Sequence, residues 1–291
     1  MRPEQRGYAL VITLWLVTLL GLLAMSFLGG SRTEVRLAGL SRSGAQALAG
    51  AESGVWLFID RLLLQGAPPA GRWRETHEIP NGKVTVDAEN EGGKLNLNLA
   101  RVELIENLLR QTSLLDEHLA ALRDAILDWR DVDGDKRRQG AEDGDYQRAG
   151  FEYGAKDGPF NSVDELRYVR GMTEEVFREL APALTVYGRH SGVDERMAGR
   201  EALLAVPGAR ADAIEGHLAT REGRGSPEGD TLGSEIDRRF LGGAPTQVYR
   251  VTATAEVSTV RRSITVFVEL DPGRQPPYTV LAWREMPGGG E

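Results

Sequence analysis

The longest apolar stretch of the chain lies near its amino terminus. Residues 8–28, YALVITLWLVTLLGLLAMSFL, contain no charged side chain. As a helix this stretch is about 31 Å long, which matches the hydrocarbon core of a bilayer. A buried core helix would normally show a polar stripe, and a cleavable secretory signal would have a shorter apolar part. The pattern therefore predicts a transmembrane segment at residues 8–28.

Helical periodicity continues beyond this segment. No proline occurs between residues 31 and 64. Apolar residues recur there at helical spacing, at Leu48, Val55, Ile59, Leu62 and Leu63. We expect local kinks at the four glycines Gly39, Gly44, Gly50 and Gly54. The pair Pro68-Pro69 ends the predicted helix. The chain thus opens with one long helix, of which the first half is apolar all round and the second half is amphipathic.

Alternating apolar and polar positions predict β-strands in two separate parts of the chain. The first strand, at residues 83–89, follows the tight-turn signal Asn81-Gly82. The others lie near the carboxy terminus, at residues 248–257, 262–270 and 278–283. The first two of these read as a hairpin. The expected fold class is α+β, with a long helix packed on a small antiparallel sheet.

A helical block from about residue 95 to 240 separates the two groups of strands. Its predicted helices cover residues 102–111 and 116–129, followed by helical hairpins at 162–180 and 195–220. The hairpin turns, at residues 171–172 and 207–208, could in principle hold DNA phosphates through their amides. However, residues 163–188 carry five acids and three bases, and residues 193–222 carry six and four. Because neither face is basic enough to release many counterions, we assign these turns to packing or partner contact.

Composition narrows the possible functions. The chain has 35 Lys+Arg against 43 Asp+Glu, a net charge of -8, which argues against nucleic-acid binding. It contains no cysteine, so it has neither a thiolate nucleophile nor a cysteine-ligated metal. A membrane-anchored hydrolase is also disfavoured. No G-x-S-x-G or H-E-x-x-H motif occurs, and His190 and Ser191 are adjacent, so neither can serve as the other's base. We predict no catalytic residues.

The residues around the start of the apolar run resemble the type IV pilin and type II secretion pseudopilin families. Arg6-Gly7 stands immediately before Tyr8 and the apolar run. These families carry a short basic leader that ends in glycine and is cut by a membrane prepilin peptidase. The resemblance implies that residues 1–7 are a leader, that cleavage falls between Gly7 and Tyr8, and that Tyr8 becomes the N-methylated terminus.

One position departs from the common pattern of these families. Most members have glutamate at the fifth mature position, where this chain has Ile12. That carboxylate is thought to pair with the terminal amine of the subunit above, because an unpaired carboxylate in lipid costs several kcal/mol. A subunit with nothing above it does not need the carboxylate. Ile12 therefore indicates a subunit at the tip of a filament, as in the K-type minor pseudopilins.

Other segments extend the resemblance to the K-type family. They are GGKLNLNLA at 92–100, VDELRYVRGM at 163–172 and VLAWRE at 280–285. That family has a helical domain inserted into a pilin-like sheet. The resemblance implies a leader at 1–7, a transmembrane segment at 8–28, pilin-like helix and first strands at 29–94, a large inserted all-helical domain at 95–240, and the last pilin-like strands at 241–291.

Carboxylates are concentrated at residues 128–145, within the helical block. Asp131, Asp133 and Asp135 alternate, and Glu142 follows Asp131 by eleven residues, so acids occupy positions 1, 3, 5 and 12 of a calcium-type loop. Lys136 stands at the sixth position, where an EF-hand has glycine, so a true EF-hand is not expected. Seven acids against four bases repel one another without a cation. A solvated polar loop, interleaved with bases, is the alternative.

In the K-type family this kind of segment, DW-x-D-x-D…GAED, binds calcium, and the resemblance implies one or two Ca²⁺ ions here. Magnesium is disfavoured because it demands strict octahedral geometry and keeps its waters. The candidate metal ligands are Asp128, Asp131, Asp133, Asp135, Glu142, Asp143 and Asp145.

The predicted function is that of a minor pseudopilin of a type II secretion system. It would cap the tip of the periplasmic pseudopilus and help initiate its assembly for the export of folded proteins. The expected location is the inner membrane, with one span and the carboxy-terminal domain in the periplasm. The expected partners are I- and J-type minor pseudopilins through the amino-terminal helix, the prepilin peptidase, and a cargo protein or the secretin. A type IV pilus or competence minor pilin, or a membrane-anchored periplasmic calcium-binding protein, are the alternatives.

Overall fold

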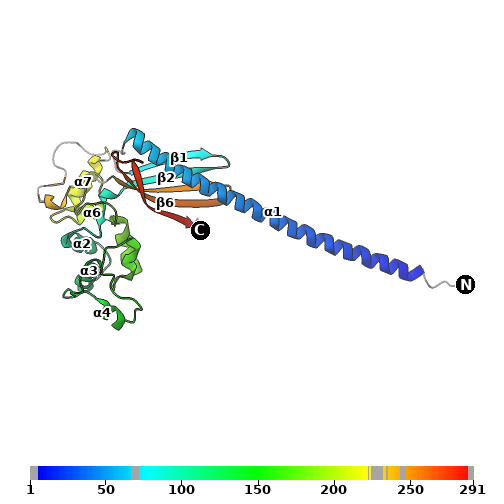
Figure 1. The fold of residues 1–291 in the computed structure, drawn as a ribbon, viewed down its shortest axis with the longest axis horizontal. Coiled ribbons are helices and arrows are strands. Elements are labelled where there is room, and N and C mark those ends of the chain that lie inside the picture. The colour runs from blue at the N-terminus through cyan, green and yellow to red at the C-terminus, as the bar shows by residue number, and fades with distance from the viewer. Residues whose placement is uncertain are drawn as a thin grey trace.

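The computed structural model describes residues 6–66, 72–221, 223, 232–233, 235–242 and 247–287. Figure 1 shows a long helix, α1, that extends far beyond a globular part made of an antiparallel sheet and a group of shorter helices. The first five residues of the predicted leader and the pair Pro68-Pro69 lie outside the described residues. The α+β fold with a pilin-like helix and sheet is confirmed.

Helix α1 spans Arg6–Gln65 without interruption, so the glycines in it do not break the helix. Two of them allow close approach to the sheet instead. A Cβ atom on Gly50 would lie 2.8 Å from Cδ1 of Ile79, and one on Gly54 would lie 2.9 Å from Cγ2 of Val84. The helix ends at Gly66, which has a φ of 80° and donates its backbone N–H to the carbonyl of Leu62. A glycine is favoured there because the left-handed conformation costs it no steric penalty.

The main sheet has five antiparallel strands in the order β1-β2-β5-β6-β7. Their bounds are β1 Arg72–Ile79, β2 Gly82–Asn90, β5 Val248–Val257, β6 Val260–Leu270 and β7 Tyr278–Pro287. The strands predicted from alternation are confirmed, as is the turn at Asn81, which has a φ of 64°. Strand β1 was not predicted. Its sequence, RWRETHEI, is mostly polar. The strand lies at the edge of the sheet, and none of its side chains is completely buried.

The second half of α1 packs across one face of this sheet. Small residues of the helix, Ala47 and Ala51, are completely buried, and Val55 and Phe58 fill the space further along. They meet the inward-facing residues of the central strands, Val84, Val86, Val251, Ala253, Ala255, Ile264, Val266 and Val268. This hydrophobic cluster is the core of the pilin-like part.

The segment between β2 and β5 forms the second globular part. Its helices are α2 Val102–Leu109, α3 Asp116–Arg130, α4 Asp143–Arg148, α5 Glu174–Leu180, α6 Arg200–Leu204 and α7 Ala211–Arg221, with 3₁₀ turns at η1 Glu91–Gly93, η2 Val163–Tyr168, η3 Ala181–Ala183 and η4 Arg238–Phe240. The turns at Gly171 and Gly208 occur as predicted, and both glycines have positive φ. The inserted part is mostly helical, as expected, and it also contains one short pair of strands. Strands β3 Leu95–Asn96 and β4 Leu184–Thr185 pair in parallel, because the extended entry segment runs beside the chain that follows η3.

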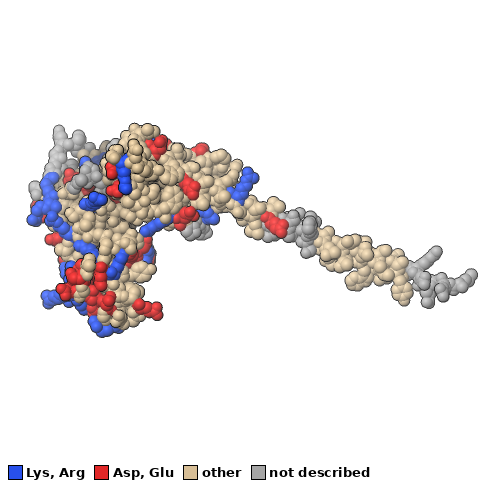
Figure 2. All heavy atoms as spheres, in the orientation of Figure 1, with Lys and Arg blue, Asp and Glu red and all other residues tan. Residues whose placement is uncertain are grey.

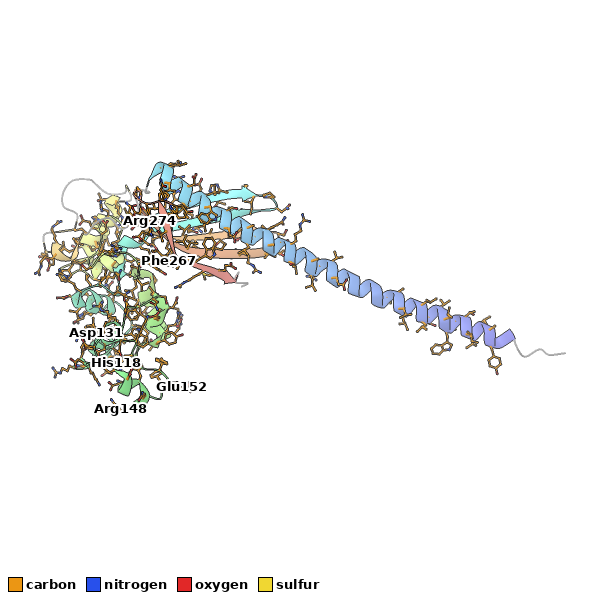
Figure 3. All side chains as sticks on the ribbon, in the orientation of Figure 1. His118, Asp131, Arg148, Glu152, Phe267 and Arg274 are labelled. Atoms are coloured by element: carbon orange, nitrogen blue, oxygen red, sulfur yellow. The ribbon has the colours of Figure 1, made fainter. Side chains whose placement is uncertain are left out.

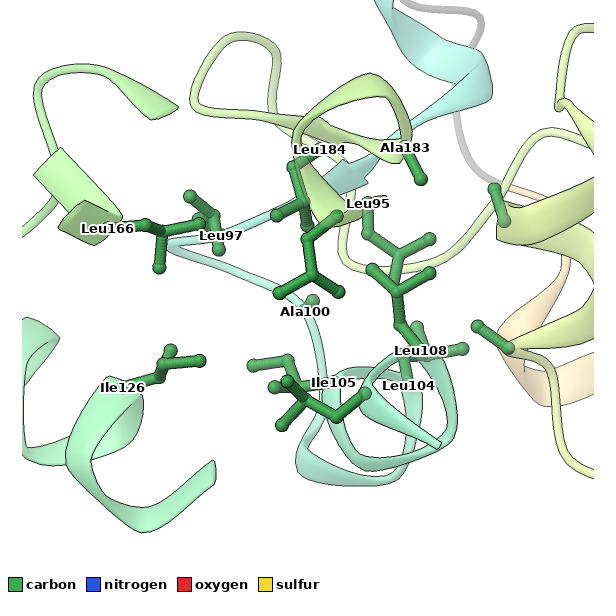
Figure 4. Close-up of a cluster of buried hydrophobic side chains, with 14 of the residues drawn as sticks. Leu95, Leu97, Ala100, Leu104, Ile105, Leu108, Ile126, Leu166, Ala183 and Leu184 are labelled. Carbon is green, nitrogen blue, oxygen red and sulfur yellow. The ribbon is translucent and has the colours of Figure 1, made fainter. Parts of the chain in front are cut away.

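This inserted part has a hydrophobic core of its own. Figure 4 shows the centre of that core, where leucines of the entry segment, α2, η2 and β4 meet Ile126 of α3. Leu95, Leu104, Leu166 and Leu203 are completely buried. The described core residues fall into two clusters, one per globular part. Each part is therefore stabilised mainly by its own apolar contacts.

Polar and aromatic contacts join the two parts at one end of the sheet. Lys94 is buried and its Nζ lies 2.6 Å from Oε1 of Glu91 and 3.1 Å from Oε2 of Glu89. The rings of Tyr187 and Phe267 lie with centroids 4.2 Å apart. This junction directs the inserted part away from the long axis of α1 (Figure 1).

Candidate metal centre

The acidic loop joins the end of α3 to the start of α4. Asp128, in the last turn of α3, is fully buried and fixes the loop. It accepts hydrogen bonds from the backbone N–H of Ala141 (2.9 Å) and from Nη1 of Arg137 (2.7 Å). A side chain at Gly140 is excluded, because its Cβ would lie 1.8 Å from Oδ2 of Asp128. Asp128 therefore holds both ends of the loop together.

Two of the predicted ligands have a buried oxygen without a partner. These are Oδ1 of Asp131 and Oε1 of Glu142, neither of which has a hydrogen-bond donor within reach. The other oxygen of Asp131 accepts from Nη1 of Arg137, which also reaches Asp128. A buried carboxylate oxygen without a hydrogen-bond donor costs free energy of folding. Two such oxygens in one loop therefore need an explanation. Carboxylate oxygens are the kind of ligand that a hard cation prefers.

Electrostatic repulsion links these acids into one cluster. Burial, reinforced by the charges of Asp128, Asp157, Asp131 and Asp143, raises the pKa of Glu142 to about 7. Burial likewise raises the pKa of Asp157, with further contributions from Asp143, Asp131 and Asp133. Mutual elevation of carboxyl pKa values means that negative charges lie close together without enough positive charge between them.

Asp157 was not among the predicted ligands. It lies twelve residues beyond the acidic segment and reaches the cluster only because the chain folds back after α4. Its φ of 50° is unusual for a residue other than glycine. No spacing signal in the sequence connects it to Asp131 or Glu142.

Two of the predicted ligands, Asp135 and Asp145, differ from the rest of the cluster. Asp145 accepts from Nζ of Lys136 (2.8 Å), from Nη2 of Arg148 (2.7 Å) and from the backbone N–H of Glu142 (3.1 Å). It thus caps α4, and these donors hold the pKa of its carboxyl well below its usual range, despite the opposing effect of burial. Asp135 is exposed, and its backbone N–H donates to Asp133.

The cluster as it stands is not a closed coordination shell. Among the residues that the structure describes, no group of three or more His, Cys, Asp or Glu side chains is close enough to hold a metal ion. The guanidinium of Arg137 lies between Asp128 and Asp131 and partly neutralises them. Figure 2 shows acidic and basic side chains intermingled at the end of the inserted part where α3 and α4 lie. The donor set, made of carboxylate oxygens, fits a hard cation such as Ca²⁺.

The first half of α1 has a different surface. Residues Tyr8–Met25 have a mean hydropathy of 2.3, and none of them is buried. This helix is long and apolar enough to cross a membrane. Tyr8 and Ile12 are both exposed on it, and Gly7 lies in its first turn. The fold and this helix together define a pilin-like protein with an apolar amino-terminal helix suited to a membrane anchor.

Comparisons with known proteins identify the family that the chain resembles. Residues 86–189 match the family model described as "Type II secretion system (T2SS), protein K". The chain is 27% identical over 208 residues to type II secretion system protein K of Aeromonas hydrophila, and 29% identical over 216 residues to that of Pectobacterium carotovorum subsp. carotovorum. Each alignment covers 62% of this chain, and 62% and 63% of those proteins, respectively.

A solved structure supports the fold. It is the complex of GspK, GspI and GspJ from the type 2 secretion system of enterotoxigenic Escherichia coli, with a TM-score of 0.61 and 16% identity. The match covers 88% of this chain and 99% of the matched chain of the complex. The chain is therefore similar in sequence to type II secretion system protein K and similar in fold to the solved complex. Protein K is a component of a secretion system.

Proposed function

We propose that the chain caps the tip of a periplasmic pseudopilus in a type II secretion system and helps to initiate its assembly for the export of folded proteins. The observation that carries this proposal is the apolar helix with Ile12 at the position where most pilin-like subunits have glutamate. A subunit with another above it would benefit from a carboxylate there, whereas a terminal subunit would only bear its cost. The role is structural, and no catalytic residue is assigned.

We also propose that the chain lies in the inner membrane with its globular parts in the periplasm, on the strength of the leader resemblance at Arg6-Gly7 and the apolar helix that follows. The prepilin peptidase would cut between Gly7 and Tyr8, and Tyr8 would then be methylated. I- and J-type minor pseudopilins are the proposed partners, with a cargo protein or the secretin at the free end. Exposed apolar side chains on α1 support helix packing: Leu37 and Leu40 lie between the membrane segment and the sheet, and Leu57 lies on the part of the helix that packs on the sheet.

Position five offers a direct test of the tip role. Val11 and Ile12 are neighbours in the apolar run, and both side chains are exposed on α1. At a tip, Ile12→Glu and Val11→Glu should reduce secretion and co-purification with I- and J-type partners equally, because each places an unpaired carboxylate in lipid at about 2–3 kcal/mol. At an internal position, Ile12→Glu alone would find the amine of the subunit above. Better secretion by Ile12→Glu than by Val11→Glu would therefore contradict the tip role.

We also propose that the acidic loop binds Ca²⁺. The two buried, unpartnered oxygens of Asp131 and Glu142 support this, together with the raised pKa values of Glu142 and Asp157. Asp128, Asp133 and Asp143 are the remaining carboxylates of the cluster, whereas Asp135 and Asp145 contribute less. A bound cation would remove the repulsion within the cluster and order the loop. The chain's own residues position the oxygens, with Asp128 fixing the loop and Asp145 capping the following helix.

A further inference from the structure

A cavity of about 360 Å³ opens on the side of the inserted part, between α3 and the turn that precedes α5. Its floor is apolar and buried, made by Leu122 and Ala125 of α3 and by Ala141 of the following loop. The hollow exists because small side chains stand where larger ones would fill it. Ala121 and Ala125 are one turn apart on the same face of α3. A volume of this size lies within the range of binding pockets for small ligands or single side chains.

The rim of the cavity is polar and carries hydrogen-bond donors. It is formed by the exposed residues His118, Gln139, Arg170 and Thr173. Although the whole chain has 43 acidic residues against 35 Lys and Arg, none of the residues that line the cavity is acidic. Figure 3 places His118 in the lower part of the inserted domain, away from α1 and the sheet. The cavity is thus separate from the junction and from the membrane segment.

Arg170 is the central group of this rim. Its backbone N–H donates to the hydroxyl of Tyr146, which fixes the turn, and Gly171 follows with a φ of 89°. In the part of the chain that the structure describes, the guanidinium of Arg170 has no ion-pair partner, whereas Arg167 nearby pairs with Asp164 and Glu174. An arginine held beside an apolar cavity, with free donors, is suited to bind a carboxylate in a bidentate manner.

We propose that this cavity binds the carboxy-terminal residue of a partner polypeptide that ends in an aliphatic side chain. A terminal residue carries a carboxylate and a side chain on the same carbon atom, which matches a donor-bearing rim directly above an apolar floor. The carboxylate meets Arg170 and the hydroxyl of Thr173, and the side chain lies over Leu122, Ala125 and Ala141. Charge complementarity selects this occupant, since an internal apolar side chain would leave Arg170 unpaired. The assignment is independent of the proposed tip role.

The test uses the full chain in lipid nanodiscs, so that free detergent does not compete for the apolar floor. The probe is a dye-labelled hexapeptide that ends in leucine with a free carboxylate, and binding is followed by fluorescence anisotropy. The same peptide with an amidated terminus is expected to bind at least about tenfold more weakly, because a charge-assisted hydrogen bond is lost. Equal binding of the two peptides would overturn the proposal.

Variants of the chain separate the two halves of the site. Arg170→Gln should weaken binding of the free-carboxylate peptide about tenfold and leave the amide unchanged. Ala121→Phe should fill the cavity and abolish binding of both. Arg138→Gln is the matched control, because Arg138 is exposed and next to the rim residue Gln139 in sequence but does not line the cavity. Undiminished binding by Arg170→Gln would refute the role of the guanidinium, even if Ala121→Phe failed to fold.

A last experiment tests whether the cavity binds a free amphiphilic acid instead of a polypeptide terminus. Decanoate also combines a carboxylate with an apolar chain. If decanoate binds the site and the hexapeptide does not, the cavity takes a free amphiphilic acid and the assignment to a polypeptide terminus is wrong. Displacement of the bound hexapeptide by an excess of its unlabelled form, but not by the amide, supports it.

Discussion

Two groups of buried carboxylates in this molecule have opposite surroundings. At the junction, Glu89 meets Arg72, Lys94 and Arg250, each through a nitrogen within 3.1 Å. Burial alone would raise the pKa of Glu89, but these three cations lower it to about 2. In the acidic loop, Glu142 has mainly acids around it, and its pKa is raised to about 7. Burial raises the pKa in both cases, so the neighbouring charges decide whether the pKa of the carboxyl ends below or above its ordinary value.

The largest effect should come from removing the central cation of the junction. Lys94→Met leaves Glu91, which is 1% exposed, without the cation 2.6 Å from its carboxylate, and it removes one of the three cations beside the half-buried Glu89. Loss of one partner from a buried ion pair typically costs about 3–5 kcal/mol. Urea unfolding followed by circular dichroism measures this loss.

Lys83→Met serves as the control for that substitution. Lys83 pairs with Glu256 on the exposed side of the sheet, and a surface pair contributes at most about 1 kcal/mol. If Lys94→Met were no more destabilising than Lys83→Met, the junction would not depend on its buried charges.

The second effect is the acid dependence of the same junction. The folded-state pKa of Glu89 lies below its ordinary value of 4.5, at about 2. Ionised Glu89 therefore stabilises the fold above pH 4.5, and this contribution disappears as the pH falls from 4.5 toward 2. A shift of this size corresponds to about 3 kcal/mol. Glu89→Gln should be less stable than the unmodified chain at pH 7, and the difference should close by pH 2.

Glu78→Gln is the comparison for this titration, since Glu78 is exposed on the neighbouring strand β1. Its stability should follow that of the unmodified chain at every pH. A constant gap between the Glu89→Gln variant and the unmodified chain from pH 7 to pH 2 would show that the ionisation of Glu89 does not contribute.

The third effect concerns the loop, where a cation should convert repulsion into stabilisation. A metal that binds only the folded state at a hundredfold excess over its dissociation constant adds about 2.7 kcal/mol. The melting temperature should therefore rise in Ca²⁺ relative to chelator. Asp131→Asn combined with Glu142→Gln should remove most of this rise, because it neutralises the two acids with unpartnered oxygens. Differential scanning calorimetry measures both.

Two further variants make the loop experiment specific. Glu117→Gln with Glu152→Gln removes the same charge from exposed positions of the inserted part and should preserve the rise. Arg137→Gln should increase the affinity for Ca²⁺, because Arg137 competes for Asp128 and Asp131. Identical melting curves in Ca²⁺ and chelator would make the loop a solvated acidic surface.

The regular elements were predictable because their patterns are strong. The apolar run of α1 and the alternation in β2, β5 and β6 follow directly from burial on one or both faces. Strand β1 could not be predicted from hydrophobic alternation, because most of its side chains are polar. Only its backbone pairing with β2 identifies it as a strand. The pair β3 and β4 was missed because two residues per strand carry no periodicity.

The loop shows a different limit. Spacing brought Asp131 and Glu142 to attention, and both have an orphaned buried oxygen. Asp145 belongs to the same acidic segment, yet the start of α4 uses its carboxylate as part of a capping box. Asp157 could not be predicted from spacing, because it comes close to the other acids only where the chain folds back after α4. Sequence spacing identifies acids that lie in one loop, whereas tertiary folding decides which acids lie close enough to raise one another's pKa.

The arrangement of β2 and β5 has a consequence for the history of the chain. Asn90, the last residue of β2, is paired in register with Tyr249 near the start of β5, so the inserted part leaves and re-enters the sheet at adjacent points. Paired residues of an antiparallel ladder lie only about 5 Å apart. A short hairpin turn would close the same gap without altering the strand order. The sheet can therefore accept, exchange or lose an entire domain at this point during evolution, while the helix and the strands keep their contacts.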